Sequence, residues 1–416
     1  MDSVRIIGAG LAGCEAALQL AEAGITVELY DVKPQQMLAA YQLPTYCELV
    51  CNNSFGSSSP DSPLGLLLYE LDLLGSKILE IAKECLVADT TTISVDKLEF
   101  SSMVTTAILQ QKIKVKKGYI DKVPQRKSPV IFATGPLTGK PLASSISKQF
   151  SLPQYTFADA SSPVIAGASI QFNNPHVHKI SKDLYAIEIP EEDFSLFFHT
   201  LTTAQHNPSH HVDYCTEFVQ CQALEKLAHK GKNEVISARF SRQGFSSPVL
   251  TIRRETGLRD AYILVGCICG LGHKSQINAF SKIPGLQAVK FIRYGRQHRN
   301  TFFQTPGVLD SFFKVKNDVR DIFIIGQLSG LDGYAPAIAS GLVAAQRIIG
   351  GVSCPVLPKD TMIGALANYV SDTSIVDYQP MCASFSLLPY SDSSVAKQQS
   401  EKLLGEYLKC TNGGKN

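Results

Sequence analysis

The stretch Val4-Arg-Ile-Ile7-Gly8-Ala9-Gly10-Leu11-Ala12-Gly13 decides the fold, together with Val27-Glu-Leu-Tyr-Asp31 further along the chain. An apolar strand over 4–7, a glycine turn over 8–13, a helix over 14–23 and a second strand over 26–30 form a βαβ unit. Tight turns and close backbone approaches need glycine, and a helix N-terminus attracts negative charge. The spacing therefore predicts a dinucleotide site rather than a ligand-free apolar turn.

The residues expected to hold the dinucleotide follow from this geometry. The glycines bring the backbone to the pyrophosphate, and an acidic residue at the end of the second strand can bind ribose hydroxyls. The candidate cofactor-binding residues of the turn and strand are Gly8, Ala9, Gly10, Leu11, Ala12, Gly13 and Asp31.

Two later strand ends favour FAD over NAD. An apolar strand ends in Ala133-Thr134-Gly135, and another ends in Gly326-Gln327-Leu-Ser-Gly330, as in flavoproteins whose chain returns to the nucleotide. Thr134, Gly135, Gly326 and Gln327 are therefore further candidate FAD-binding residues. No second glycine turn with its acidic partner is visible, so we expect NADH or NADPH to dock only transiently, as the reductant.

The chain divides into segments around this unit. We expect an α/β fold, with a Rossmann-like FAD-binding domain of the glutathione-reductase type formed by 1–145 and 291–390. A mixed α/β substrate or RNA-binding domain over 146–290 is inserted between these halves. Residues 391–416 are polar and are expected to form a weakly ordered C-terminal tail.

Composition limits the other possibilities. The 416 residues are 44% hydrophobic, and 39 Lys+Arg against 37 Asp+Glu give a net charge of +2, so an RNA partner would need a local basic face. No apolar run approaches a membrane span, and the 11 cysteines include no CxxC pair. We expect a cytoplasmic protein with reduced thiols, no metal site, no membrane contact and no stable protein partner.

Two cysteines and one basic segment are the remaining candidates for chemistry. Cys51 lies in a long loop rich in small polar residues, and Cys221 lies in Glu217-Phe-Val-Gln-Cys221-Gln-Ala-Leu-Glu225. Each has the alternative of being a buried small hydrophobe, and neither has a basic neighbour in sequence that would lower its thiol pKa. The segment 293–301 is either a solvated face or an anion-binding wall, with substrate candidates Arg296, His298, Arg299 and Asn300.

Over nearly its whole length the chain resembles the folate- and FAD-dependent tRNA (uracil-5-)-methyltransferases, TrmFO. The motifs that carry this resemblance are Ile7-Gly-Ala-Gly-Leu-Ala-Gly-Cys-Glu-Ala16, Glu48-Leu-Val-Cys-Asn-Asn-Ser54, Ala133-Thr-Gly-Pro-Leu-Thr138, Ile283-Pro-Gly-Leu286, Arg293-Tyr-Gly295, His298-Arg-Asn-Thr301, Gly326-Gln327, Gly333-Tyr334, Ala339-Ser-Gly-Leu342, Asn368-Tyr369 and Gln379-Pro-Met381.

The resemblance implies a reaction that the motifs alone do not give. Methylenetetrahydrofolate would donate a one-carbon unit, carried on N5 of reduced FAD, to C5 of a uridine, usually the T-loop uridine at position 54 of tRNA. The target base must leave its stack. By resemblance Cys221 is the nucleophile that adds to C6 of the uracil, and Cys51 is a second cysteine near the flavin. Basic candidates for the RNA phosphates are Lys112, Lys114, Lys116, Lys117, Arg239, Arg242, Arg253 and Arg254.

The chain also departs from the family pattern. Gln220 replaces the usual glycine before the nucleophile, Gln222-Ala223 replaces Met-Pro after it, and Pro336 stands where a glutamate is expected. Three alternatives therefore stay open: the same chemistry on 23S rRNA, a flavin-binding RNA-interacting protein that has lost methyl transfer, and the larger relative that modifies the wobble uridine. The last carries a long helical C-terminal region that is not seen in this sequence.

Overall fold

A parallel sheet of five strands forms the centre of the first lobe, in the order β15–β6–β1–β2–β5. The computed structural model describes residues 3–37, 41–87, 92–125, 128–204, 222–255, 260–375, 378–390 and 392–412. The strands are β1 (Val4–Ile7), β2 (Val27–Asp31), β5 (Ile113–Lys117), β6 (Val130–Phe132) and β15 (Ile322–Ile324). The residues of β6 and β15 are all buried, as parallel strands covered on both faces require, whereas the edge strand β5 carries lysines that discourage edge-to-edge pairing.

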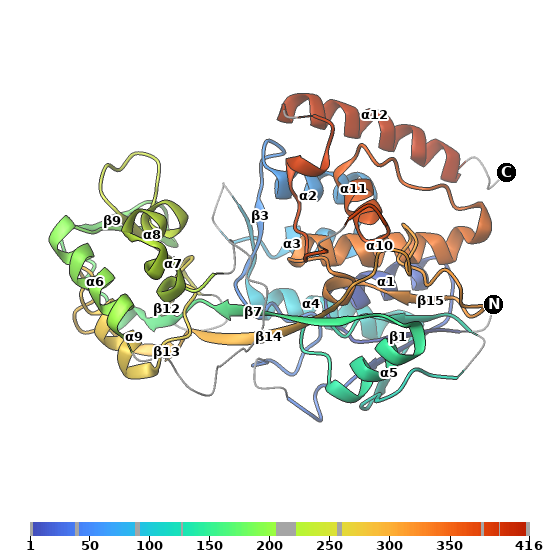
Figure 1. Ribbon diagram of the computed structural model, residues 1–416, viewed down its shortest axis with the longest axis horizontal. Helices are drawn as coiled ribbons and strands as arrows, with labels where there is room; N and C mark the ends of the chain where they lie inside the picture. The colour runs from blue at the N-terminus through green and yellow to red at the C-terminus, as the bar shows by residue number, and fades with distance from the viewer. Residues whose placement is uncertain are drawn as a thin grey trace.

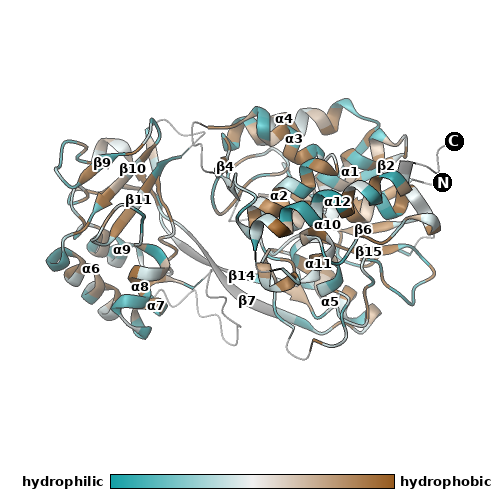
Figure 2. Ribbon diagram, turned by 90° about the horizontal axis from the view of Figure 1, so that it is seen from above, coloured by the Kyte–Doolittle hydropathy of each residue, from teal (hydrophilic) through white to brown (hydrophobic). Residues whose placement is uncertain are grey.

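Helices cover this sheet. They are α1 (Leu11–Glu22), α2 (Pro63–Leu73), α3 (Lys77–Glu84), α4 (Lys97–Gln110), α5 (Lys140–Phe150), α10 (Tyr334–Gly350) and α11 (Met362–Tyr369), with a small hairpin of β3 (Ser54–Ser57) and β4 (Thr92–Ser94). Helices α1 and α10 pack closely because Gly341 has no side chain: a Cβ there would lie 2.3 Å from the carbonyl oxygen of Ala12. The ribbon of α12 alternates hydrophobic and hydrophilic residues, as helices with one buried face do (Figure 2).

One segment, Tyr334–Ser353, is long and apolar enough to qualify as a membrane span by length and composition. It comprises α10 and the short 3-10 helix η5 (Gly351–Ser353), and most of it is buried inside the first lobe against α1. Its apolar character is accounted for by this core position.

A second lobe is built on a separate antiparallel sheet, ordered β13–β8–β12–β11–β10–β9. Its strands are β8 (Val164–Ala166), β9 (Val177–Lys179), β10 (Leu184–Glu188), β11 (Val249–Arg254), β12 (Ala261–Leu264) and β13 (Phe291–Arg293), and its helices are α6 (Glu191–Thr203), α7 (Leu224–Lys230), α8 (Lys232–Arg239) and α9 (His273–Phe280). Phe194, Phe197, Phe240 and Phe280 form an aromatic core with ring centroids 5.4 to 5.8 Å apart. This lobe therefore has its own hydrophobic core.

The two lobes are joined by a long two-stranded ribbon of β7 (Gln154–Ser161) and β14 (Arg296–Phe303), which runs between them in Figure 1. Its strands are antiparallel and stay in register from Gln154 opposite Phe303 to Ser161 opposite Arg296. The chain therefore leaves the first lobe and returns to it at neighbouring points. Further short 3-10 helices are η1 (Gly167–Ser169), η4 (Gly326–Ser329) and η6 (Phe385–Leu387).

A buried group of charges also connects the lobes. Lys97, at the start of α4, donates to Glu255 at 2.9 Å, and Arg293 of β13 lies 3.7 Å from the other oxygen of Glu255. Arg253 of β11 donates to Ser94 Oγ of β4 at 3.0 Å. The exposed fractions of the Lys97 and Glu255 side chains are 9% and 2%, so this pair is shielded from water and screened little by salt.

The C-terminal segment differs from the expected weakly ordered tail. Residues Ser393–Asn412 form helix α12, which packs on α2 and lies beside it in Figure 1. Its inward face is Ala396, Ser400, Leu404 and Tyr407, which are buried at helical spacing. The sequence does not show this stripe as an apolar pattern, because the segment is polar and one of the four buried positions is a serine.

Buried carboxylates satisfy the free N–H groups of two helix N-termini. Glu15 accepts from Ser76 Oγ and the backbone N–H groups of Lys77 and Ile78 at the start of α3. Glu70 of α2 accepts from the N–H groups of Met362 and Ile363 at 2.8 and 2.7 Å, and from Ser400 Oγ of α12 at 2.6 Å. Glu70 therefore ties α2, α11 and α12 together.

We expect this carboxyl group to make stability depend on pH. Burial raises the pKa of Glu70 to about 7, against the opposing effect of its three hydrogen bonds. Because the folded pKa lies above the ordinary value of 4.5, the folded state binds the proton more tightly, and this contribution to stability is lost as pH rises through about 7. The shift corresponds to about 3 kcal/mol.

Urea unfolding at pH 5.5 and pH 8 measures this effect. Wild type is expected to lose unfolding free energy between the two pH values, and Glu70→Gln, which cannot titrate, is expected to lose less. Glu70→Gln should also cost about 1–3 kcal/mol at pH 5.5, because its amide leaves one backbone N–H without an acceptor. Equal pH dependence in the two proteins would show that Glu70 does not titrate in this range.

Candidate functional site

Three segments far apart in sequence meet where β1, β6 and β15 end. These strands are neighbours, with Ile7 beside Phe132 and Phe132 beside Ile324, so the turns that follow them lie at the same edge of the sheet. Gly8 has φ +106°, and a Cβ there would lie 2.3 Å from the carbonyl oxygen of Ala133. The glycine turn and the second predicted segment therefore touch through their backbones.

Within the turn, Gly13 is tightly packed against the backbone, whereas the space around Gly10 is open. A Cβ on Gly13 would lie 1.9 Å from the carbonyl oxygen of Gly8, so Gly13 is needed for packing. A Cβ on Gly10 would meet nothing within 4 Å, and Gly10 caps α1 without a side-chain hydrogen bond. The space in front of the α1 N-terminus is therefore open, where a pyrophosphate would meet backbone N–H groups.

The third segment closes on the same helix. Gly326 has φ +65°, its Cβ would lie 3.3 Å from the Cβ of Ala12, and its N–H donates to Ser340 Oγ of α10 at 2.8 Å. The side chain of the neighbouring Gln327 donates to Asp332 at 3.0 Å. Thr134 and Gly135 thus follow β6, which adjoins β1, and Gly326 and Gln327 follow β15, which adjoins β6. Gly135 has φ +69° with open space around it.

Asp31 lies at the end of β2, as the motif requires. Its two carboxylate oxygens accept from the N–H groups of Ala9 at 2.7 Å and Lys33 at 2.8 Å. Each oxygen has a second lone pair, so the carboxylate can still accept from a hydroxyl. The bond to Ala9 also fixes the glycine turn relative to the strand end.

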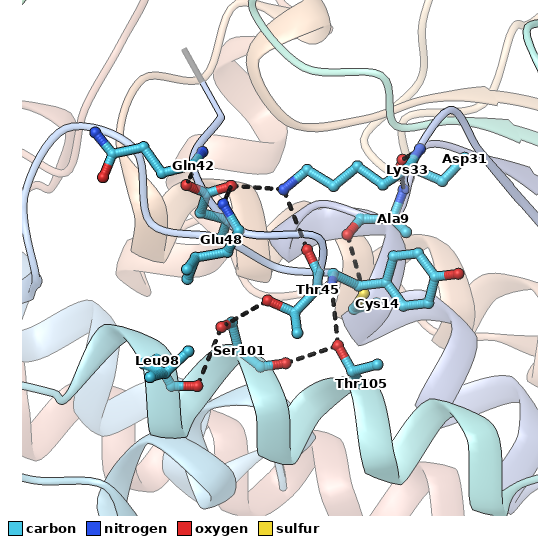
Figure 3. Close-up of polar contacts among 12 residues, drawn as sticks. Ala9, Cys14, Asp31, Lys33, Gln42, Thr45, Glu48, Leu98, Ser101 and Thr105 are labelled. Atoms are coloured by element: carbon cyan, nitrogen blue, oxygen red, sulfur yellow. Dashed lines mark hydrogen bonds and ion pairs between the residues drawn. The ribbon is translucent and has the colours of Figure 1, made fainter. Parts of the chain in front are cut away.

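The long loop after β2 lies against the glycine turn. Lys33 and Glu48 form a pair at 2.6 Å whose side chains are each 5% exposed, and Lys33 also donates to the carbonyl oxygen of Thr45 (Figure 3). Thr45 bonds to Ser101 of α4, and the N–H of Tyr46 donates to Thr105 one turn later. These contacts tie residues 45–48 of the loop to Lys33 and to α4.

The same loop brings Cys51 to the predicted cofactor edge. The backbone N–H of Cys51 donates to the hydroxyl of Tyr334 at 2.8 Å, and that of Asn52 lies 3.3 Å from the same oxygen. Tyr334 is the first residue of α10 and follows the Gly326–Gly333 segment. This contact leaves no signal in the sequence, because the two residues are 283 positions apart.

Five other thiols in the described part of the chain are poor candidates for nucleophiles. Burial raises the pKa of Cys267 and Cys269, and raises that of Cys382 to about 12 and Cys85 to about 11. A hydrogen bond to Cys47, together with burial, raises the pKa of Cys14. These groups stay protonated near pH 7.

Cys221 lies outside the described residues, but the residue after it is described. Gln222 is buried, its side-chain oxygen accepts from Lys230 Nζ at 2.8 Å, and its carbonyl oxygen accepts from Arg239 at 3.3 Å. The sequence shows no basic residue beside Cys221, whereas the fold places Lys230 and Arg239 in contact with Gln222, the residue that follows it.

The predicted anion-binding wall is strand β14 of the ribbon. The backbone of Arg296, His298 and Arg299 pairs with β7, and their side chains lie outside the described part of the structure. The side chain of Asn300 is described, and this residue is 3% exposed. The segment is therefore a paired strand rather than a strand running into a solvated loop.

Among the basic residues predicted to contact RNA phosphates, the prediction for Arg253 is wrong. It is buried at the lobe junction on Ser94 and does not face solvent. Lys116 pairs with Glu28 at 3.0 Å, and Arg254 pairs with Asp183 at 3.5 Å, at the protein surface.

A family model and curated relatives both match most of this chain. The model of the family described as glucose inhibited division protein A matches residues 3–352. The methylenetetrahydrofolate–tRNA-(uracil-5-)-methyltransferase TrmFO of Lactobacillus gasseri is 33% identical over 97% of this chain and 95% of its own length, and that of Bacillus subtilis is 32% identical over 93% and 92%.

Among solved structures, GidA of Aquifex aeolicus in its form II crystal aligns with a TM-score of 0.71 and 16% identity. The alignment covers 97% of this chain and 73% of that chain. At this identity the likeness establishes the fold, and it confirms the predicted fold class.

Proposed function

Because the chain belongs to the family described as glucose inhibited division protein A, and within it to the TrmFO proteins, we propose that it methylates C5 of uridine in tRNA with methylenetetrahydrofolate and FAD. The observation that carries this proposal is the meeting of the glycine turn, two strand returns and the Cys51 segment at one sheet edge. A flavin held there would lie beside the segment that bears a family cysteine.

The finer parts of the proposal follow from the family resemblance. The target is the T-loop uridine at position 54, NADH or NADPH is the reductant, and the enzyme works in the cytoplasm on tRNA. The same chemistry on 23S rRNA is the competing substrate assignment.

The residues at the sheet edge fit FAD. The open space at Gly10 and the uncapped N-terminus of α1 suit its pyrophosphate, and the Asp31 carboxylate suits a ribose. When bound, FAD would carry the one-carbon unit from methylenetetrahydrofolate and supply the electrons that reduce it to a methyl group. The protein's part is to hold the flavin, the folate and the base in line and to exclude water.

The two cysteines have different proposed roles. The thiolate of Cys221 adds to C6 of the uracil, which makes C5 nucleophilic. C5 then bonds to the one-carbon unit, the C5 proton leaves to a base, and the bond from sulfur to C6 breaks, which releases the thiolate. Cys51 lies at the flavin and protects its activated form. Lys230 and Arg239, held on Gln222, provide positive charge near the position of Cys221 in the chain.

Labelled methylenetetrahydrofolate and NADPH with FAD-loaded protein and unmodified tRNA transcript test this function. Wild type should transfer label to uridine in the T-loop, and Cys221→Ala should lower the rate by at least about 1,000-fold. Cys410→Ala, at an exposed thiol, is the matched control and should keep wild-type activity.

Two results would lead to other assignments. Label on 23S rRNA and none on tRNA would reassign the substrate. A yellow protein that binds RNA and transfers no label would mean that methyl transfer has been lost, in agreement with the changed residues around Cys221.

A further inference from the structure

Three aromatic rings stack in the second lobe, beside the lobe junction. The rings of His273 and Tyr294 are 3.9 Å apart and inclined by 8°, and those of Tyr294 and Phe291 are 4.8 Å apart and inclined by 12°. Phe291 in turn packs on the buried Phe280 at 6.0 Å. We call His273, Tyr294 and Phe291 the aromatic ladder; its inner end rests on the core and its outer residue, His273, is exposed.

The ladder is held by a buried glutamine. The side chain of Gln276, one turn after His273 on α9, accepts from the N–H of Gly295 at 2.9 Å and donates to the carbonyl oxygen of Gly295 at 2.9 Å. Gln276 is fully buried. These two hydrogen bonds between the Gln276 side chain and the Gly295 backbone hold Tyr294 against the first turn of α9. The stacked arrangement therefore does not depend on the weak attraction between the rings alone.

The chain around the ladder is basic. Residues 261–309 contain no Asp or Glu, and they carry six basic residues: Lys274, Lys282, Lys290, Arg293, Arg296 and Arg299. Of these, Arg293 is paired with Glu255 at the lobe junction. The net charge of the whole protein is only +2, so this segment is a local concentration of positive charge. A polyanion is the partner that such a segment favours.

We propose that the aromatic ladder is a base-stacking platform on which an unpaired nucleobase of the RNA substrate rests against His273. Stacking on aromatic rings is how proteins hold unstacked bases, while nearby lysine and arginine side chains contact the phosphates. The inference rests on the proposed function for the identity of the RNA. It adds a binding subsite in the second lobe, apart from the cysteines and from the predicted FAD site.

The position of the ladder suits this role. Tyr294 follows Arg293, which pairs with Glu255 at the contact with Lys97 of the first lobe. RNA stacked on His273 would therefore lie next to the junction between the lobe that carries the glycine turn and the lobe that carries the residues following Cys221.

Binding of tRNA transcript to FAD-loaded protein tests the platform. His273→Ala should weaken binding by about 5- to 100-fold, the range found when an aromatic stacking partner of a base is removed. His273→Phe should restore it. His199→Ala, at another exposed histidine of the same lobe, is the matched control and should bind as wild type.

Salt dependence separates stacking from charge. His273→Ala should shift the plot of log K against log salt without changing its slope, whereas Lys290→Ala should reduce the slope. In the methylation assay His273→Ala should raise KM for tRNA and leave KM for methylenetetrahydrofolate unchanged. Unchanged tRNA binding in His273→Ala, or an effect on folate KM alone, would overturn the proposal.

These measurements distinguish failure of the proposed function from failure of the proposed stacking platform. If wild type binds tRNA but methylates nothing, the function is wrong and the binding comparison still decides the platform. If wild type methylates tRNA and His273→Ala binds it equally well, the platform is wrong and the function stands.

Discussion

Gly10→Ala should leave the protein folded but deprive it of FAD, whereas Gly13→Ala, three residues later, should destabilise the fold itself. A methyl group on Gly10 meets no protein atom within 4 Å, and its φ of −81° suits alanine. The methyl group would instead stand where the pyrophosphate approaches the backbone. Losing charge-assisted hydrogen bonds of about 1.5–3 kcal/mol would weaken FAD binding by about 10- to 100-fold.

At Gly13 the same methyl group would lie 1.9 Å from the carbonyl oxygen of Gly8. Helix α1 must then move away from β1, at a cost of about 3 kcal/mol. Flavin titration and urea unfolding of the apoproteins measure the two effects. If Gly10→Ala lowered apoprotein stability, or if both variants bound FAD as wild type does, the assignment of this turn to the pyrophosphate would be incorrect.

Glu255→Gln is expected to cost about 3–5 kcal/mol of unfolding free energy, because it removes the negative charge from a buried group of cations. Lys97 and Arg293 would lose their carboxylate, with Arg253 also buried at this junction. Lys97→Met should cost less, since Glu255 would still lie beside Arg293. Methylation should fall further than FAD binding, because the junction sets how the lobes face each other.

The control for this prediction is an ion pair at the surface. The side chains of Asp72 and Lys83 are 52% and 44% exposed, and Asp72→Asn should cost less than about 1 kcal/mol. Thermal unfolding of the three variants at equal salt measures the difference. A cost for Glu255→Gln as small as that for Asp72→Asn would mean that water reaches the junction.

The cofactor edge was predictable because each of its parts leaves a local signal. Gly8, Gly13 and Asp31 occur at spacings that a βαβ turn requires, and Gly135 and Gly326 each end an apolar run. What the pattern could not give is how these parts contact one another, since the pairing of Val130 with Ile322 depends on the sheet order.

Other features could not be predicted because their meaning depends on distant partners. Arg253 looks like any surface arginine in sequence, and only the docking of β11 on β4 buries it. The Tyr334 hydroxyl reaches Cys51 across almost the whole chain. In α12 a serine stands in the buried stripe because it bonds to Glu70, so an apolar pattern understates the burial.

The ribbon of β7 and β14 has a consequence for the order in which the chain emerges from the ribosome. The second lobe is complete once Arg293 has been made, whereas the first lobe, begun at Val4, waits for β15 and α10. The inserted lobe can therefore fold first, while the apolar strand β6 still lacks its neighbour β15. Newly made chains pass through a stage in which one lobe is finished and the FAD site still lacks its third segment.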